Sequence, residues 1–335
     1  MKKDRVVSGM RPTGKLHLGH LVGALGNWVP LQETYDCFYF VADWHALTSE
    51  FADTSRLTTY AYDNVADWIG AGLDPEKSTF FIQSLVPEHA ELHLLLSMVV
   101  PVPWLERVPT YKEQQENLKD KDLSSIGFLG YPLLQTADVA MYDARVVPVG
   151  EDQVAHLELG REVVRRFNNM FGGGADVLVE PQPLLTTFGR LPGLDGDKKM
   201  SKSLGNTIHL SDSADEVRKK VMRMYTDPKR VRADIPGTVE GNPVFVYHDA
   251  FNPNAAEVED LKARYRAGRV GDVDVKTTLA AALNARLDPI RERRAAVLAE
   301  PGALREVLFE GSARARAVAA QTIARVRAAM KIAYR

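Results

Sequence analysis

The sequence predicts an α/β protein, in which a parallel β-sheet covered by helices is followed by an all-helical part. Short β-rich runs alternate with helical periods in the first part of the chain, and such alternation is typical of parallel sheets. Beyond about residue 210 only helical periods occur. The chain has 335 residues, and a domain usually takes about 150, so two domains are expected.

The individual elements follow from residue type and periodicity. β-branched and aromatic runs predict strands at Arg5–Ser8, Cys37–Ala42, Thr79–Gln83 and Val146–Val149. Amphipathic periods between them predict helices at Thr54–Ile69 and Ala90–Val99. Ser213 and Glu216 have the spacing of a capping box, which predicts a helix through Met224. Three further helices are expected at Glu257–Arg266, Lys276–Arg286 and Ser312–Ala333.

The charge balance gives the molecule no overall attraction to a polyanion. Lys and Arg number 42 against 44 Asp and Glu, so contact with a nucleic acid would depend on local patches. Residues 218–232 hold seven basic side chains and one acid, and residues 311–335 hold six basic side chains and no acid. Both patches, around Arg218–Arg232 and Arg314–Arg335, are candidates for contact with a nucleic acid, although either patch alone is more typical of a solvated helix face.

Cysteine usage and hydropathy indicate a cytoplasmic protein. Cys37 is the only cysteine, which excludes disulfides and cysteine-based metal sites and suits a reducing compartment. The sequence contains no run of 18 apolar residues, so neither export nor membrane insertion is expected.

The segment GMRPTGKLHLGH, from Gly9 to His20, carries two overlapping nucleotide signals after the first expected strand. Its first half follows the phosphate-loop pattern G-x-x-x-x-G-K, but Leu16 stands where that loop needs a magnesium-binding hydroxyl. Its second half, HLGH, places two imidazoles around Gly19. Ligands of parallel sheets bind beyond the carboxyl ends of the strands, so this segment is a candidate nucleotide site.

A second candidate lies at Asp197–Ser203, DKKMSKS, where lysines and hydroxyls alternate around Met200. Lysines that reach a phosphate chain neutralise the charge that builds on the bridging oxygen as its bond breaks. The alternative is a charged loop that serves only solubility.

Together, in this order, HLGH and KMSKS resemble the two signature elements of class I aminoacyl-tRNA synthetases. The resemblance narrows to the bacterial tryptophanyl-tRNA synthetases through FYFVADWHALT, YPLLQTADVAMYD, VPVGEDQVAHLELGREVVRRFN and the TDP at residue 226. It implies a Rossmann-like catalytic domain at residues 1–205 and a helical tRNA-binding domain at residues 206–335, with the last helix a candidate to pack back on the catalytic domain.

The resemblance also implies which residues hold ATP and act in catalysis. The catalytic candidates are His17, His20, Lys199 and Lys202. The candidates for ATP binding are Arg11, Pro12, Thr13, Gly19, His20, Gly150, Glu151, Asp152, Leu191, Lys199, Met200, Ser201, Lys202 and Ser203. Magnesium is expected to arrive with ATP, without a metal site built by the protein alone.

For the amino acid, Asp138 is the central candidate. It lies among apolar residues on the helix that Pro132 starts, where a buried carboxylate needs a donor, and an indole N–H is such a donor. The alternative is an Asp138 on the exposed face of that helix. The other candidates for the tryptophan pocket are Tyr131, Gln153, His45, Gln135, Val147 and Val149. Gln135 and Arg11 depart from the common family residues, methionine and glutamine.

The implied partners are L-tryptophan, tRNA(Trp) and a second copy of the chain, with no DNA and no membrane. Residues 104–121 are the candidate for part of the dimer seam. Some relatives bind an iron–sulfur cluster through cysteines near residues 240–275, where this chain has Asn242, Asp272 and Val275, so no cluster is expected. The tyrosyl homologue and a catalytically silent binding module stay open as alternatives.

Overall fold

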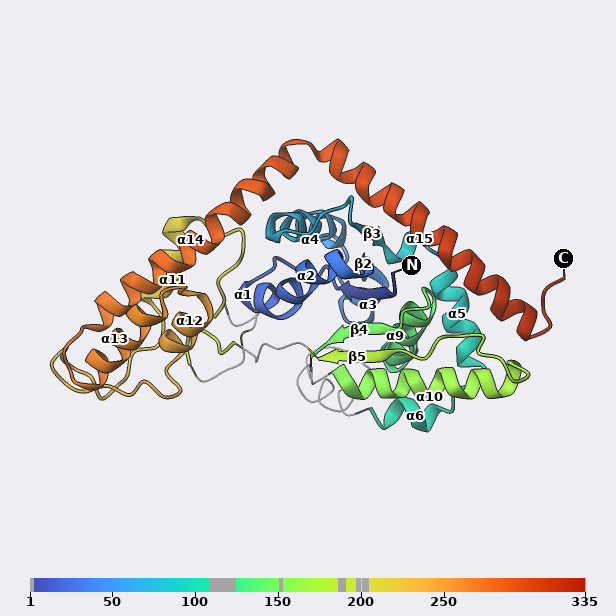
Figure 1. Ribbon diagram of the computed structural model, residues 1–335, viewed down its shortest axis with the longest axis horizontal. Coiled ribbons are helices and arrows are strands. Elements are labelled where there is room, and N and C mark those ends of the chain that lie inside the picture. The colour runs from blue at the N-terminus through green and yellow to red at the C-terminus, as the bar shows by residue number, and fades with distance from the viewer. Residues whose placement is uncertain are drawn as a thin grey trace. The chain divides into compact units, whose positions relative to one another are not determined.

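The computed structural model describes residues 3–108, 125–150, 153–185, 191–196, 200 and 205–334. The chain divides into two compact units (Figure 1). The sheet unit comprises Met1–Gly14, Ala24–Thr187 and Glu300–Arg335, and the helical unit comprises Lys15–Gly23 and Phe188–Ala299. These two units are defined only by how compactly their residues pack. The assignment of a catalytic domain to residues 1–205 and of a tRNA-binding domain to residues 206–335 stays a prediction.

The sheet unit is built on five parallel strands in the order β3-β2-β1-β4-β5. The strands are β1 Arg5–Met10, β2 Asp36–Val41, β3 Ser78–Ile82, β4 Val146–Val149 and β5 Gln182–Leu185. The first four confirm the expected strands to within two residues. β5 was not predicted, because QPLL is short and largely exposed and contains Pro183, which is tolerated at the edge of a sheet.

The strand order reverses between β1 and β4. The chain builds outward from β1 through β2 to β3 and then returns to place β4 on the other side of β1, where Val6 pairs with Val146. In open parallel sheets ligands bind at the carboxyl ends of the strands beside such a reversal. The segments that follow β1 and β4 are therefore the natural place for a ligand.

Helices cover the sheet, and their bounds in this unit are α2 Gly26–Thr34, α3 Asp43–Glu50, α4 Leu57–Ala71, η2 Gln83–Leu85 (a 3₁₀ turn), α5 Glu88–Ser97, α6 Val102–Glu106, α8 Ile126–Leu129, α9 Tyr131–Ala140, α10 Val154–Phe171 and α15 Pro301–Ala329. The expected helices correspond to α4, α5 and α15. None of the helices in the described ranges combines the length and hydropathy needed to cross a bilayer.

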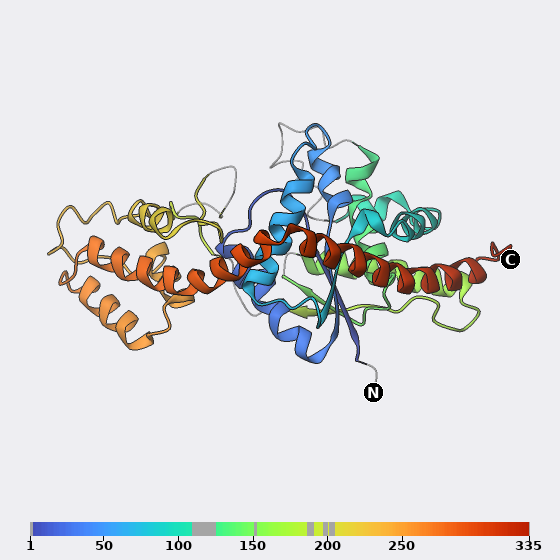
Figure 2. The same ribbon diagram turned by 90° about the horizontal axis from the view of Figure 1, so that it is seen from above.

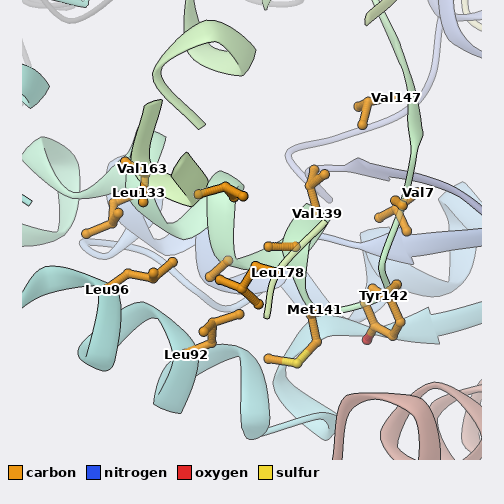
Figure 3. Packing of buried hydrophobic residues seen from close by; sticks show 14 of the residues in the cluster. Val7, Leu92, Leu96, Leu133, Val139, Met141, Tyr142, Val147, Val163 and Leu178 are labelled. Carbon is orange, nitrogen blue, oxygen red and sulfur yellow. The ribbon is translucent and has the colours of Figure 1, made fainter. Parts of the chain in front are cut away.

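The main core of this unit lies between the sheet and helices α5, α9 and α10 (Figure 3). Leu92 and Leu96 of α5 contribute apolar side chains beside those of α9 and α10, and Val7 and Val147 contribute from the strands. All are buried. Full burial of one such side chain is worth about 1.5–3 kcal/mol, so this cluster fixes α5 and α9 against the sheet.

The helix α15 lies along the edge strand β3 and against α5 and α4. Figures 1 and 2 show it, in red, running beside this unit to the C-terminus. A Cβ added to Gly311 would lie 1.8 Å from the Phe80 carbonyl oxygen, so only glycine permits this approach. Ser312 Oγ accepts a hydrogen bond from the Ile82 N–H at 3.2 Å. The exposed backbone edge of β3 is thereby covered.

The helical unit contains α1 Leu18–His20, α11 Ala214–Met222, α12 Pro243–Phe251, α13 Ala255–Arg266 and α14 Asp272–Ala299. A π-helical turn, η1 Leu21–Leu25, follows α1. The capping box predicted for Ser213 and Glu216 is present at the start of α11. α14 is longer than the helix expected at Lys276–Arg286.

Arg230 belongs to a basic patch of the sequence but is buried in the helical unit. Its guanidinium donates to the carbonyls of Ile235, Ala233 and Val270 at 2.7–2.9 Å and lies 3.3 Å from an Asp272 carboxylate oxygen. It also lies 4.0 Å from the centre of the Tyr265 ring. Arg230 is therefore part of the internal structure rather than of a surface for polyanions.

Arg230→Met is expected to destabilise the helical unit by about 3 kcal/mol or more, because it leaves buried carbonyls and a carboxylate without their cation. The change is measured by urea unfolding of the full chain. Arg232 is the control, since it is exposed and pairs only with Asp234 in the described structure, at 2.6 Å. Its substitution by Met should shift stability by less than about 0.5 kcal/mol. Equal effects would contradict the structural role of Arg230.

Candidate functional site

His17 and His20 build the start of α1 with their own side chains. His17 Nδ1 accepts a hydrogen bond from the Gly19 N–H at 3.1 Å, and His20 Nδ1 accepts one from the His17 N–H at 3.2 Å. The two rings form a capping box, a role usually taken by Ser or Thr with Glu. Their centroids lie 3.9 Å apart.

These capping bonds determine where the imidazole protons lie. A ring nitrogen that accepts from a backbone N–H carries no proton, so each neutral imidazole carries its proton on Nε2. Each of the two side chains is therefore a hydrogen-bond donor through Nε2. Donors of this kind suit the oxygens of a phosphate group.

Met200, the described residue of KMSKS, lies beside HLGH within the helical unit. A Cβ built on Gly19 would come within 3.3 Å of Met200 Sδ and 3.0 Å of the His17 ring, so a larger residue there would require these side chains to move by a few tenths of an ångström. The chain after KMSKS also pairs with HLGH, since Leu18 N donates to Ile208 O at 3.0 Å. Met200 and HLGH are therefore neighbours in space although they are far apart in sequence.

The short segment before KMSKS is held by hydrogen bonds. Asn206 Nδ2 donates to both carboxylate oxygens of Asp195, at 3.1 and 3.2 Å, and Tyr247 donates to the Pro192 carbonyl at 2.8 Å. Leu191 and Met200 are buried. The predicted site residues that lie outside the described structure are Glu151, Asp152, Lys199, Ser201, Lys202 and Ser203.

The remaining nucleotide candidates follow adjacent strands. Arg11, Pro12 and Thr13 come directly after β1, where Thr13 N donates to Arg11 O at 2.9 Å. Gly150 comes directly after β4, and its carbonyl accepts from Gln153 N at 2.9 Å where α10 begins. The structure thus brings these candidates to the carboxyl ends of β1 and β4, where the strand order reverses.

Asp138, 1% exposed on α9, lies at the centre of a buried hydrogen-bond cluster. His45 Nε2 of α3 donates to its Oδ2 at 2.7 Å, and His89 Nδ1 of α5 donates to its Oδ1 at 2.6 Å. Gln83 Nε2 of η2 lies 2.8 and 2.9 Å from the two oxygens. An ionised carboxylate has about four lone-pair positions, and all are engaged here.

The protein itself supplies donors to the buried Asp138 carboxylate, so its burial does not by itself require an indole N–H. The assignment of an indole N–H to Asp138 stays a prediction. Burial alone raises the pKa of Asp138, yet the charge of His45 and hydrogen bonds from His45 and His89 outweigh it and lower the pKa to about 2. The alternative of an exposed Asp138 is excluded.

The Asp138 carboxylate places a proton on His89 Nδ1, because an ionised carboxylate oxygen only accepts. The Tyr142 hydroxyl lies 2.7 Å from the other ring nitrogen, Nε2. Burial, and then the negative charge of Asp138, raises the pKa of Tyr142 well above its ordinary value, so this hydroxyl stays protonated.

The other pocket candidates surround this cluster. The Tyr131 ring lies edge-on to His45 with centroids 4.5 Å apart. The side chain of Gln135 pairs with His156 Nδ1 at 3.0 Å. Gln153 is the residue before α10. The predicted wall residues Val147 and Val149 are buried and belong to the core cluster of β4.

Four residues of this region were not predicted from the sequence: Gln83, His89, Tyr142 and His156. Two signals were available for the first two. Gln83 follows β3 directly, at the carboxyl end of a strand, and His89 is four residues before His93, which places both histidines on one face of α5. Tyr142 and His156 had no distinguishing local signal.

Comparisons with known proteins decide the family. The family model described as tRNA synthetases class I (W and Y) matches residues 1–288. The chain belongs to this family. The tryptophan--tRNA ligase of Thermotoga maritima is 50% identical over 331 residues, covering 98% of this chain and all of the relative. That of Treponema pallidum is 49% identical over 333 residues, covering 99% and 98% of the two chains.

A solved structure shows the same similarity. The tryptophanyl-tRNA synthetase of Campylobacter jejuni, in complex with ADP and tryptophan, superposes with a TM-score of 0.86 at 32% identity and covers 98% of this chain and 99% of its own. The Rossmann-like α/β fold with C-terminal helices is thereby confirmed for this class I synthetase.

The positions considered for an iron–sulfur cluster have other partners in this synthetase. Asn242 caps α12, Asp272 pairs with Arg230, and the Val275 carbonyl lies 3.0 Å from His248 Nε2. Within the described ranges, no three His, Cys, Asp or Glu residues are grouped to hold a metal ion.

Asp138→Asn is expected to change how stability depends on pH. Because the folded pKa of Asp138, about 2, lies below the ordinary 3.8, its charged form contributes stability above about pH 4 that is lost as the pH falls through 2. The variant should lose about 2 kcal/mol at neutral pH and lack this part of the acid slope. Urea unfolding between pH 2 and 6 measures it.

Asp4→Asn is the control, because Asp4 is exposed and lies 3.7 Å from Arg145. An unchanged acid slope in Asp138→Asn would show that the carboxylate is not stabilised by its buried donors.

Proposed function

We propose that this synthetase activates L-tryptophan with ATP and transfers it to tRNA(Trp). The tryptophan carboxylate attacks the α-phosphorus of ATP, the bond to the bridging oxygen of pyrophosphate breaks, and tryptophanyl-AMP forms. A terminal ribose hydroxyl of the tRNA then takes the acyl group and AMP leaves. The observation that carries the proposal is the pairing of HLGH with the KMSKS methionine, beside near-full-length likeness to tryptophan--tRNA ligases.

The chain's contribution to the first step is position and charge. His17 and His20 carry Nε2–H donors for phosphate oxygens, since their Nδ1 atoms accept backbone bonds. We assign Lys199 and Lys202 to neutralise the negative charge that develops on pyrophosphate. Met200, Ser201 and Ser203 are assigned to ATP binding in the same motif. Electrostatic stabilisation of this kind often contributes more to catalysis than any other effect. Magnesium accompanies ATP as part of the substrate.

The remaining ATP contacts are assigned to residues that follow β1 and β4, to Gly19 of HLGH and to Leu191 in the segment before KMSKS. The residues are Arg11, Pro12, Thr13, Gly19, Gly150, Glu151, Asp152 and Leu191. They combine backbone groups at close approach with acceptors for the ribose hydroxyls, which together orient the α-phosphate toward the amino acid.

For the amino acid, we assign the indole N–H to Asp138. Gln83 Nε2 contacts both carboxylate oxygens, so a shift that leaves it on one oxygen frees the other for the indole. Tyr131, His45, Gln135 and Gln153 complete the polar side of the pocket, with Val147 and Val149 behind them. A site built for this hydrogen bond rejects side chains that lack the donor.

Amino-acid-dependent ATP–pyrophosphate exchange tests the function. Tryptophan should support exchange and tyrosine should not, whereas a silent binding module would support neither. A benzothiophene isostere that lacks the indole N–H forgoes a hydrogen bond to a charged group, so it should be used about 10- to 150-fold less well than tryptophan.

In Asp138→Ala the two compounds should become nearly equal, because the acceptor is gone. Equal use of both by the wild-type chain would refute the assignment of Asp138. Asp4→Asn serves again as the control.

We further propose that tRNA binds the exposed part of the first basic patch in the helical unit, the side chains of Arg218, Lys219, Arg223 and Lys229. Phosphate contacts by Lys and Arg supply most of the affinity of such interfaces. Arg218→Glu with Lys219→Glu should raise the KM for tRNA by tenfold or more and leave pyrophosphate exchange unchanged.

Aminoacylation assays at two salt concentrations measure this effect, which should weaken as salt rises. Lys220→Ala is the control, because Lys220 pairs with Asp212 at 2.6 Å. An equal fall in exchange would mean that the patch is structural.

We also propose that the protein is cytoplasmic and that it forms a homodimer. Leu94 of α5, Met98 directly after it and Val102 of α6 are 53%, 67% and 52% exposed, and exposed apolar side chains of this kind suit a subunit contact. The seam candidate at residues 104–121 begins within α6, and its residues 109–121 lie outside the described structure. Sedimentation that gives a monomer at micromolar concentration would refute the dimer.

A further inference from the structure

The helix α15 contacts the rest of its unit next to Gln83 and His89, two of the three donors to Asp138, and next to Tyr142, which pairs with His89. Ser312 accepts from the N–H of Ile82, which precedes Gln83. Arg316 Nε donates to Glu88 at 2.9 Å, and Glu88 precedes His89. Arg325 donates to Asp143 at 2.6 Å, and Asp143 follows Tyr142. Three contacts of one helix therefore lie one residue from three members of the Asp138 cluster.

We propose that α15 positions the amino-acid pocket, with Ser312 and Arg316 as positioning residues for the donors of Asp138. This inference rests on the proposed function, since it concerns the same pocket. Neither side chain contacts Asp138 itself. Each holds the backbone from which Gln83 or His89 reaches the carboxylate.

The contact with β3 leaves little freedom for a shift. Ser312 is 4% exposed, accepts from Ile82 and donates to the Leu308 carbonyl at 2.7 Å, so its hydroxyl is held on both sides. Gly311 lies directly against the Phe80 carbonyl. Because helix and strand backbones touch, a displacement of α15 moves the end of β3, and Gln83 is the next residue.

The contacts with α5 and the turn after α9 act on His89 and on Tyr142, its hydrogen-bond partner. Glu88 is the first residue of α5, and Arg327 adds a two-pronged contact to Glu91 on the same helix, with both distances 2.6 Å. Asp143 has a backbone φ of +52°, which is unfavourable for a residue with a side chain. Its pairing with Arg325 stabilises this turn, from which Tyr142 reaches His89.

Two glycines of α15 provide a matched test. Gly311→Ala places a methyl group where the Phe80 carbonyl lies and must displace the helix, whereas Gly302→Ala meets no atom within 4 Å. Both changes add the same group to the same helix. Gly311→Ala should raise the KM for tryptophan and reduce the preference for tryptophan over the benzothiophene isostere, with the KM for ATP unchanged. Gly302→Ala should match the wild type.

Ser312→Ala is the milder variant, and it keeps the helix in place while removing two hydrogen bonds, of which only the one from Ile82 joins α15 to β3. A net hydrogen bond corresponds to about a 2- to 12-fold effect, so the preference for tryptophan should fall by that factor. Arg316→Ala should act in the same direction. Arg314→Ala is its control, because the only contact found for Arg314 in the described structure is with Glu310 of the same helix, at 3.9 Å.

Amide hydrogen exchange gives a readout that needs no substrate. In Ser312→Ala the Ile82 and Gln83 amides should exchange faster than in the wild type, and in Gly302→Ala they should not. Unchanged tryptophan preference in Gly311→Ala and Ser312→Ala, beside an active wild-type chain, would overturn the positioning role alone. Failure of the wild-type chain to exchange with tryptophan would instead overturn the proposed function.

Discussion

A buried carboxylate is the constraint on which the rest of the pocket depends. Removing the Asp138 charge from water is costly unless several donors replace the lost hydration. The donors come from η2, α3 and α5, while Asp138 is on α9, so four elements must meet at one point. Apolar packing brings α5 and α9 together, but it tolerates small shifts. The hydrogen bonds to Asp138 do not, and they set the geometry.

In the HLGH motif the side chains are oriented by hydrogen bonds from the backbone rather than by a buried charge. The imidazoles of His17 and His20 cap α1 through Nδ1, which selects the tautomer with its proton on Nε2. A hydroxyl at either position could also make the cap and donate, but both bonds would involve one atom, whereas an imidazole places its donor on the other side of the ring. This requirement accounts for the two histidines of HLGH, and the closeness of Met200 and the His17 ring favours glycine between them.

The sequence correctly predicted those features that depend on residues close together in the chain. Four strands and the capping box at Ser213 follow from residue type within a few positions, and burial of Asp138 follows from its apolar neighbours on one helix. The donors Gln83 and His89 could not be found in this way, because they lie about 50 residues away and meet Asp138 only after the sheet forms. β5 was missed because its QPLL carries little strand propensity and its place is set by pairing with β4.

The number of basic residues in a stretch of sequence predicted the positive surface poorly, because several of these residues pair with acids elsewhere in the folded chain. The six basic residues near the C-terminus formed a patch in the sequence, yet Arg316, Arg325 and Arg327 each meet an acid of the sheet unit. Arg230 of the other patch is buried. A cation already paired with a carboxylate attracts a phosphate less, since the pair is nearly neutral at a distance. Most of the positive potential available to tRNA therefore lies on the exposed residues around α11, and the paired arginines of α15 hold that helix against α5 and the turn after α9.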